Sequence, residues 1–320
     1  MPTRDGTGPD HEELLLLWSA RRTGVLDALT TTAGTADDVA DETGLDRETS
    51  ARFVRALADD GYLRRVGGEY EVTNRALGFL ATRDVRSIGA TPRALDLLDA
   101  MAEIGPDRAG DEGWTRDAER PDADERRLRH RLGAHTATPR ATVRAGVTAA
   151  VHAAPDADRV VDVYGGSGVY ATEFVRRGRA TTLVESRDVL DVVEPMLAGQ
   201  GVDTVETDEP TAVPVVDADL AVLADVVQRH PPAADRRLLQ SVHDALVPGG
   251  AVVVLEPLRD RSPAARRVAV ERLAVGRGDA YTSDEVEAWL GDAGFVDHET
   301  RDVPGTTVQA VVGRRERGVD

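Results

Sequence analysis

Residues 160–168 carry the residue types in this chain that are best suited to holding a ligand. Their sequence is Val-Val-Asp-Val-Tyr-Gly-Gly-Ser-Gly, an apolar strand that runs into a glycine-rich turn. A helix is expected directly after the turn, so that backbone N–H groups at its start can face a bound group. Gly166 and Gly168 let the backbone approach that group where a Cβ would collide. The segment therefore predicts a site for a nucleotide-like ligand.

Acidic residues follow the next two apolar segments. Residues 180–184 predict a strand that ends in Glu185, about 20 residues beyond the turn, where a ribose diol needs a carboxylate acceptor. Asp208 follows a short apolar pair around Val205. The competing interpretation is an α/β domain that binds no nucleotide and whose acids are ordinary solvated strand ends.

Alternating strands and helices must position these residues. We expect strands at 160–164, 180–185, 219–223 and 251–256, helices at 169–177, 188–198, 235–246 and 283–293, and an antiparallel pair near 295–302 and 307–313. This alternation predicts an α/β fold, a mostly parallel sheet with helices on both faces.

An N-terminal domain is expected over residues 1–100. A helix from His11 carries apolar residues as far as Leu29, a second helix is expected at 35–42, and a third starts near Asp46. Residues 61–73 alternate around a Gly67-Gly68 turn and predict a hairpin. Three helices and a hairpin together predict a winged helix.

The middle of the chain is expected to link this domain to the α/β domain. Residues 84–104 predict a helix, 105 to about 127 a charged loop with one aromatic residue, Trp114, and 137–153 a helix rich in alanine and valine. We therefore expect a helical linker with a charged loop over residues 101–154 and a ligand-binding domain over 155–320.

Composition limits the partners and the compartment. The 320 residues include 57 acidic and 39 basic ones, giving a formal net charge of −18, and every basic residue is an arginine. Such a surface predicts a halophilic, salt-adapted protein. A high-GC genome is a compatible explanation. The charge argues against nonspecific binding to nucleic acid or to anionic membranes.

Cysteine is absent, so neither disulfides nor thiolate metal sites are expected, and the histidines show no metal-ligand spacing. The N-terminus lacks the apolar core of a signal peptide, and residues 14–18 are too few to span a bilayer. We expect a soluble, cytoplasmic protein.

The sequence resembles class I S-adenosylmethionine-dependent methyltransferases, and more narrowly the O-methyltransferase family that includes hydroxyindole, caffeic-acid and antibiotic enzymes. The matching residues are 162–168, Glu185, Asp208, 219–223, 248–250, Glu256 and 293–295. The resemblance implies a Rossmann-like methyltransferase domain, S-adenosyl-L-methionine as cofactor and a small-molecule acceptor. It also implies that the N-terminal winged-helix domain makes a homodimer.

The resemblance implies a role for each residue of the cofactor site. The turn would hold the methionine end of the cofactor, Glu185 the ribose hydroxyls and Asp208 the adenine amino group. Ala224 stands where a lysine-like residue often contacts the cofactor. Tyr164 stands where the family has a glycine and would narrow the site or stack near the ligand. The implied cofactor residues are Asp162, Tyr164, Gly165, Gly166, Gly168, Glu185, Asp208 and Ala224.

At the catalytic position the sequence departs from the family. The family's histidine base falls on Gln228, which cannot remove a proton, whereas the carboxylate that orients the base is present as Glu256. Three explanations stay open. In the first, His230, two residues further along, acts as the base. In the second, no base is needed, because proximity and orientation of the reactants suffice. In the third, the protein binds the cofactor without methylating anything.

The rival functions are a noncatalytic S-adenosylmethionine-binding regulator, a winged-helix transcription regulator and a dehydrogenase. The dehydrogenase is least favoured, because the turn lacks the Gly-x-Gly-x-x-Gly spacing.

Overall fold

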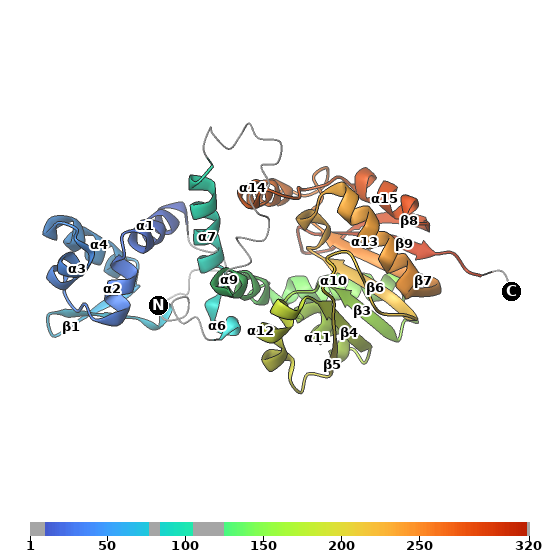
Figure 1. Ribbon diagram of the computed structural model, residues 1–320, viewed down its shortest axis with the longest axis horizontal. Helices are drawn as coiled ribbons and strands as arrows, with labels where there is room; N and C mark the ends of the chain where they lie inside the picture. Colours follow the sequence, from blue (N-terminus) through green and yellow to red (C-terminus); the bar gives the residue numbers. More distant parts are fainter. Residues whose placement is uncertain (1–9, 77–83, 105–124, 319–320) are drawn as a thin grey trace. The chain divides into compact units, whose positions relative to one another are not determined.

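The computed structural model describes residues 10–76, 84–104 and 125–318 (Figure 1). The described residues divide into two compact units, of which the first comprises residues up to 103 together with 125–137 and the second comprises the rest. The boundaries expected at residues 100 and 154 stay predictions. Trp114 and most of the charged loop lie outside the described residues.

Short helices and one hairpin build the N-terminal unit. The elements in chain order are α1 (His11–Arg22), α2 (Val25–Thr31), α3 (Ala36–Thr43), α4 (Arg47–Asp59), β1 (Leu63–Val66), β2 (Glu69–Val72), α6 (Val85–Ile88), α7 (Thr91–Ala102) and α9 (Glu125–Thr136). The side chains of Thr35 and Asp46 cap α3 and α4 by accepting from backbone N–H groups three residues ahead. β1 and β2 pair antiparallel, as expected for the hairpin.

Three expectations for these helices were wrong. The single helix from His11 to Leu29 is two helices, because Gly24 takes a left-handed φ of 78° between α1 and α2. The helix expected over 84–104 is likewise interrupted, by Gly89 with a φ of 70°. Residues 125–127, expected to end a loop, are instead the first turn of α9.

A seven-stranded sheet forms the centre of the second unit. Its strands are β3 (Arg159–Val163), β4 (Ala180–Glu185), β5 (Val202–Glu206), β6 (Ala218–Ala224), β7 (Leu246–Glu256), β8 (Phe295–Asp302) and β9 (Gln309–Arg315). Their order in the sheet is β5-β4-β3-β6-β7-β9-β8, and only the β7–β9 and β9–β8 neighbours are antiparallel. The α/β fold with a mostly parallel sheet is confirmed.

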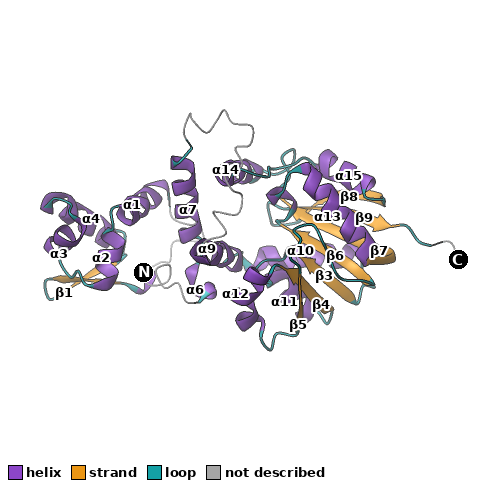
Figure 2. Cartoon of the chain, viewed as in Figure 1, coloured by secondary structure: helices purple, strands orange, loops and turns teal. Residues whose placement is uncertain are grey.

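Helices cover both faces of this sheet (Figure 2). They are α10 (Arg140–Ala153), α11 (Val169–Arg176), α12 (Arg187–Leu197), α13 (Pro232–Ala245), α14 (Ala265–Val275) and α15 (Ser283–Asp292). One core cluster joins α10 and α11 to the sheet, and another joins α13 and α15 to it. Leu220 and Val222 of β6 belong to the first cluster and Ala221 and Leu223 to the second, as alternation in a strand buried on both faces requires.

Two elements near the end of β6 and β7 had not been expected. A 3₁₀ turn, η2 (Val227–Arg229), follows β6, and α14 follows the loop after β7. The apolar pattern of α14 predicts a helix only weakly, because two of its apolar residues, Val270 and Leu273, are exposed and do not lie on a buried face.

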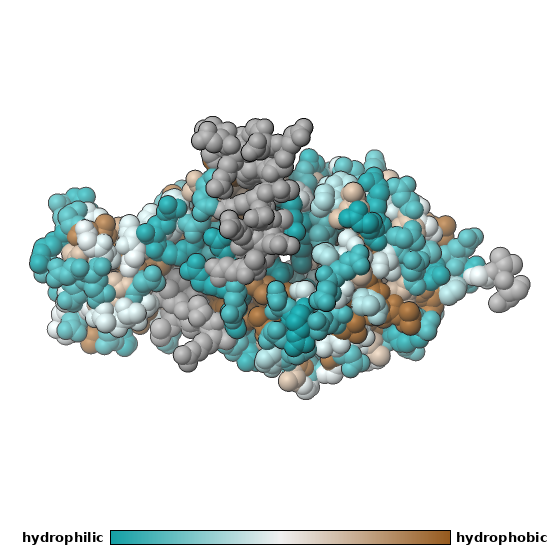
Figure 3. Space-filling view, viewed as in Figure 1, coloured by the Kyte–Doolittle hydropathy of each residue, from teal (hydrophilic) through white to brown (hydrophobic). Residues whose placement is uncertain are grey.

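The visible face of the molecule is mostly hydrophilic (Figure 3), in keeping with the net charge of −18. Among the helices within the described ranges, none has the length and hydropathy that crossing a bilayer requires.

Candidate active site

The glycine turn lies where the strand order reverses. The chain runs from β3 outward to β4 and β5, then returns to β6 on the other side of β3. In sheets of this kind, ligands bind at the carboxyl ends of the strands beside that reversal. Residues 164–168 follow β3 and residues 225–229 follow β6, so both segments border this position.

Asp162 fills the space beneath the turn. Its carboxyl is fully buried, and Oδ2 accepts from the backbone N–H of Ala171 in α11 at 3.0 Å. A Cβ on Gly165 would lie 2.3 Å from the Asp162 Cγ, so the turn closes over the carboxyl only with glycine there. Burial raises the pKa of Asp162 to about 7. Within the described ranges, its Oδ1 has no hydrogen-bond partner.

Gly168 shapes the other end of the turn. It is the N-cap of α11 and has a φ of 70°, a left-handed conformation that glycine adopts without strain. A Cβ at this position would also lie 2.9 Å from Leu197 Cδ2. Because Gly168 has no side chain, the backbone of the turn packs close to its neighbours, and the backbone of a ligand-binding turn must approach its ligand in the same way.

The ring of Tyr164 is fixed by the segment after β5. Its hydroxyl donates to the carbonyl oxygens of Glu209 and Ala212, at 2.7 and 2.9 Å, and the side chain belongs to the core on the α13 side. Its backbone has a φ of 50°, which is uncommon for a residue other than glycine. The tyrosine therefore ties the glycine turn to residues 209–212.

Glu185 touches the turn directly. Its Oε1 accepts from the N–H of Gly166 at 3.0 Å and its Oε2 from the N–H of Ser186 at 2.9 Å. The side chain is 4% exposed. Each carboxylate oxygen has a second lone pair, so this group can still accept from a diol. Asp208, by contrast, is exposed and lies two residues beyond β5.

Gln228 joins two acidic side chains at the ends of β6 and β7. Its Nε2 donates to Asp225 Oδ1 at 2.9 Å and to Glu256 Oε2 at 2.8 Å, while its backbone N–H donates to Glu256 Oε1 at 3.3 Å. Both amide protons of Gln228 are thereby used. Ala224, just before Asp225, is fully buried and offers only a methyl group.

Burial favours the neutral forms of these two carboxyls. It raises the pKa of Glu256 to about 8, with the charge of Asp225 as the next cause. It also raises the pKa of Asp225, against the opposing charge of Arg229. Two carboxyls this close lose their protons as a pair rather than independently.

His230 stands apart from this cluster. Its Nδ1 lies 3.2 Å from Asp235 Oδ1, and its carbonyl oxygen accepts from the hydroxyl of Tyr281 at 2.6 Å. Burial lowers the pKa of His230 to about 4 and raises that of Asp235 to about 9, so both are neutral at pH 7. Among the described residues, no hydrogen bond joins His230 to Gln228 or Glu256.

Asp225, Arg229 and Asp235 had not been singled out from the sequence. The signal for Asp225 was its place directly after the buried strand 219–224, where a polar residue reaches the edge of the sheet. Arg229 Nη1 lies 3.4 Å from the carbonyl oxygen of Tyr164, so it reaches from the β6 side to the β3 side. No group of three His, Cys, Asp or Glu side chains in the described part of the chain is arranged to hold a metal ion.

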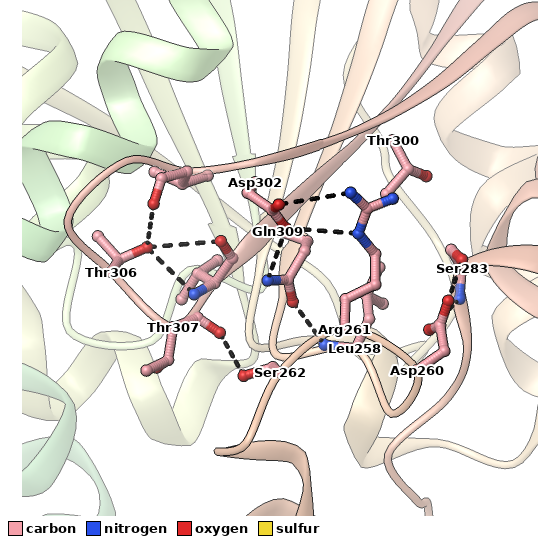
Figure 4. A network of polar contacts seen from close by, with 12 residues as sticks. Leu258, Asp260, Arg261, Ser262, Ser283, Thr300, Asp302, Thr306, Thr307 and Gln309 are labelled. Atoms are coloured by element: carbon pink, nitrogen blue, oxygen red, sulfur yellow. Dashed lines mark hydrogen bonds and ion pairs between the residues drawn. The ribbon is translucent and has the colours of Figure 1, made fainter.

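The loop between β7 and α14 is anchored on the C-terminal hairpin (Figure 4). Leu258 N–H donates to Gln309 Oε1 at 3.0 Å, Arg261 Nε to Asp302 Oδ1 at 3.3 Å, and Ser262 Oγ to the carbonyl of Thr307 at 2.6 Å. These bonds fix the start of α14, whose later residues lie close enough to Asp225 to shift its pKa.

Comparisons with known proteins show which domains and folds this chain resembles. Residues 141–296 match the O-methyltransferase domain, and residues 11–103 match the HVO_A0261 N-terminal domain. The tetracenomycin polyketide synthesis 8-O-methyl transferase TcmO of Streptomyces glaucescens is 32% identical over 109 residues. That match covers 32% of this chain and 32% of the relative's length.

Solved structures share the fold over nearly the whole chain. Human N-acetylserotonin methyltransferase in complex with S-adenosylmethionine has a TM-score of 0.65 at 19% identity, covering 97% of this chain and 99% of that one. An O-methyltransferase family protein from Burkholderia thailandensis gives 0.69 at 19%, covering 97% and 96%. The mitomycin 7-O-methyltransferase MmcR gives 0.66 at 22%, covering 94% of each.

Proposed function

We propose that this chain, whose residues 141–296 match the O-methyltransferase domain, transfers a methyl group from S-adenosylmethionine to a hydroxyl oxygen of a small molecule. The observation that carries the proposal is the contact between Glu185 and Gly166, 3.0 Å from Oε1 to N, beside the strand-order reversal. A buried carboxylate fixed against a glycine turn is what a ribose and its attached methionine chain require.

The described residues fit this cofactor. Residues 165–168 supply close backbone approach, and Glu185 supplies acceptors for the ribose hydroxyls. Asp208, exposed beyond β5, is proposed to lie near the adenine. When bound, the cofactor supplies a methyl carbon on a sulfonium, and attack by the acceptor oxygen breaks the carbon–sulfur bond with its electron pair left on sulfur.

We also propose that the N-terminal unit makes a homodimer and does not bind DNA. Three of its arginines on α4 and β1 form ion pairs with acids. Arg47 lies 2.7 Å from Asp37, Arg52 pairs with Glu48, and Arg64 lies 2.7 Å from Glu71. A DNA-reading face carries a clear excess of positive charge, which these ion pairs remove. A mobility-shift assay would therefore show no complex, and sedimentation would show a dimer.

Calorimetric titration with S-adenosylmethionine and S-adenosylhomocysteine in molar KCl tests the cofactor assignment. We expect both to bind, and binding to be lost in Glu185→Ala. The matched control is Glu206→Ala, because Glu206 is the register partner of Glu185 on β5 but is exposed and paired with Arg187. Equal losses in the two variants, or no binding by the wild-type protein at any salt concentration, would refute the assignment.

A further inference from the structure

Asp225 has an unusual backbone at the carboxyl end of β6, the strand beside β3 and its glycine turn. It follows the last residue of β6 and has a φ of 56°, and its N–H donates to the carbonyl oxygen of Leu255 at 3.0 Å. Residues in this left-handed region, glycine aside, gather at functional sites. β6 borders β3 at the reversal of strand order, so Asp225 stands opposite the glycine turn that would hold the cofactor.

The side chain of Asp225 is the accessible member of a pair. Glu256 is 4% exposed and both of its oxygens accept from Gln228, whereas Asp225 keeps partial exposure and accepts from Gln228 through Oδ1. Because the amide of Gln228 gives its protons to both carboxyls, it has none left for an acceptor. A proton from an acceptor hydroxyl can therefore pass to Asp225 more directly than to Glu256.

Charged groups from three elements face Asp225. Glu256 on β7 and Glu271 on α14 disfavour its ionised form, while Arg229 on η2 and Arg272 on α14 favour it. Burial outweighs the arginines, so the pKa of Asp225 stands above that of an ordinary aspartate. A carboxylate with a raised pKa is a stronger base, and a base is most effective when its pKa approaches the working pH.

The histidine alternative is weaker. The pKa of His230 is lowered to about 4 by burial, and its Nδ1 is taken up by Asp235 at 3.2 Å. An imidazole so weakly basic removes a hydroxyl proton poorly.

We propose that the carboxylate of Asp225 is the general base of the transfer, with Gln228 as its positioning residue. The inference rests on the proposed methyl transfer and commits it to acceptors whose hydroxyl is protonated in solution. As the acceptor oxygen bonds to the methyl carbon, an oxygen of Asp225 takes the hydroxyl proton. The products are a methyl ether, S-adenosylhomocysteine and a protonated Asp225, which then returns its proton to solvent.

The test compares Asp225→Asn with Asp297→Asn. Asp297 is an exposed aspartate on β8 with a φ of 54°, so the control makes the same chemical change at a similar backbone conformation. Both proteins are first titrated with S-adenosylmethionine, and then assayed with unsubstituted phenol and with 2,4-dinitrophenol, a nitrophenol that is already ionised at neutral pH. Aspartate carboxyls labelled with ¹³C give the titration of Asp225 without any acceptor.

We expect Asp225→Asn to bind the cofactor, to lose activity on phenol by on the order of 100-fold or more, and to keep most of its activity on the ionised nitrophenol. The ¹³C resonance missing from this variant should titrate above the ordinary aspartate value of about 4. Equal losses on both acceptors, or a missing resonance that titrates at the ordinary value, would overturn the assignment of Asp225. Failure of the wild-type protein to bind the cofactor would instead refute the proposed function.

Discussion

Gly165→Ala tests whether the turn depends on the buried carboxyl beneath it. An added Cβ would lie 2.3 Å from Asp162 Cγ and 2.3 and 2.4 Å from its two oxygens, about 1 Å inside the 3.4 Å where ordinary contact begins. The backbone of Gly165 lies outside the left-handed region, so alanine fits its conformation and only the collision matters. The carboxyl must move, and with it the 3.0 Å bond to Ala171.

The cost follows from two effects. A buried donor left without its acceptor costs about 1–3 kcal/mol, and overpacking a filled site costs about 1–3 kcal/mol more. We therefore expect Gly165→Ala to lower the free energy of unfolding by about 2 kcal/mol or more, and Tm by about 4 °C at the least. Cofactor binding should weaken as well, because the turn is displaced.

Denaturant unfolding of four proteins separates this collision from a general effect: wild type, Gly165→Ala, Asp162→Ala and the double variant. With the carboxyl gone, the added methyl group should cost much less, which gives a large coupling energy. Gly318→Ala is the control, since no atom lies within 4 Å of the added Cβ. Equal costs of Gly165→Ala with and without Asp162 would refute the argument.

Three further perturbations have defined outcomes. Tyr164→Phe removes the hydroxyl bonded to two carbonyl oxygens, so we expect a loss of about 1 kcal/mol in denaturant unfolding and weaker cofactor binding by calorimetry; unchanged binding would contradict its role in tying the turn to residues 209–212. Since Asp235 has a pKa raised to about 9 when folded, the folded state holds its proton longer than the unfolded chain, and stability should fall from pH 6.5 to 8.5. Asp235→Asn should reduce that fall, and an identical fall in the variant would show that Asp235 is ordinary. The net charge of −18 predicts that Tm rises as KCl increases from 0.1 M to about 2 M, and a flat or falling Tm would exclude salt adaptation.

The central strands of the sheet were predictable because they are apolar runs bounded by turns. β6 and β7 are buried on both faces, so their sequences contain nearly unbroken valine, leucine and alanine. The glycine turn was predictable for the same local reason. Helix α9 was not predicted, because only two of its buried residues, Leu128 and Leu132, are large apolar side chains, and most of its first two turns is charged. The break at Gly24 had a local signal, the glycine itself, that was missed.

The site was less predictable than the fold. Glu185 could be placed from its spacing to the turn, because β3 and β4 are neighbours in a parallel sheet and their ends meet. The cluster around Gln228 depends on η2 folding back over the end of β7, a contact between residues 28 positions apart. The resemblance had paired Gln228 with Glu256, but nothing in the sequence showed that Gln228 also bonds Asp225.

With an amide at position 228 in place of the family's histidine, Glu256 has no imidazole to orient. A carboxylate beside a histidine orients the imidazole base, but the amide of Gln228 has no basic nitrogen that could take up a proton. Instead, the Nε2 of Gln228 donates to the carboxyls of both Asp225 and Glu256, at 2.9 and 2.8 Å. Because the two carboxyls lose their protons as a coupled pair, the negative charge at the site depends on the protonation of both. For the proposed methyl transfer, we therefore expect the acidity of the acceptor hydroxyl, and not its shape alone, to decide which molecules react.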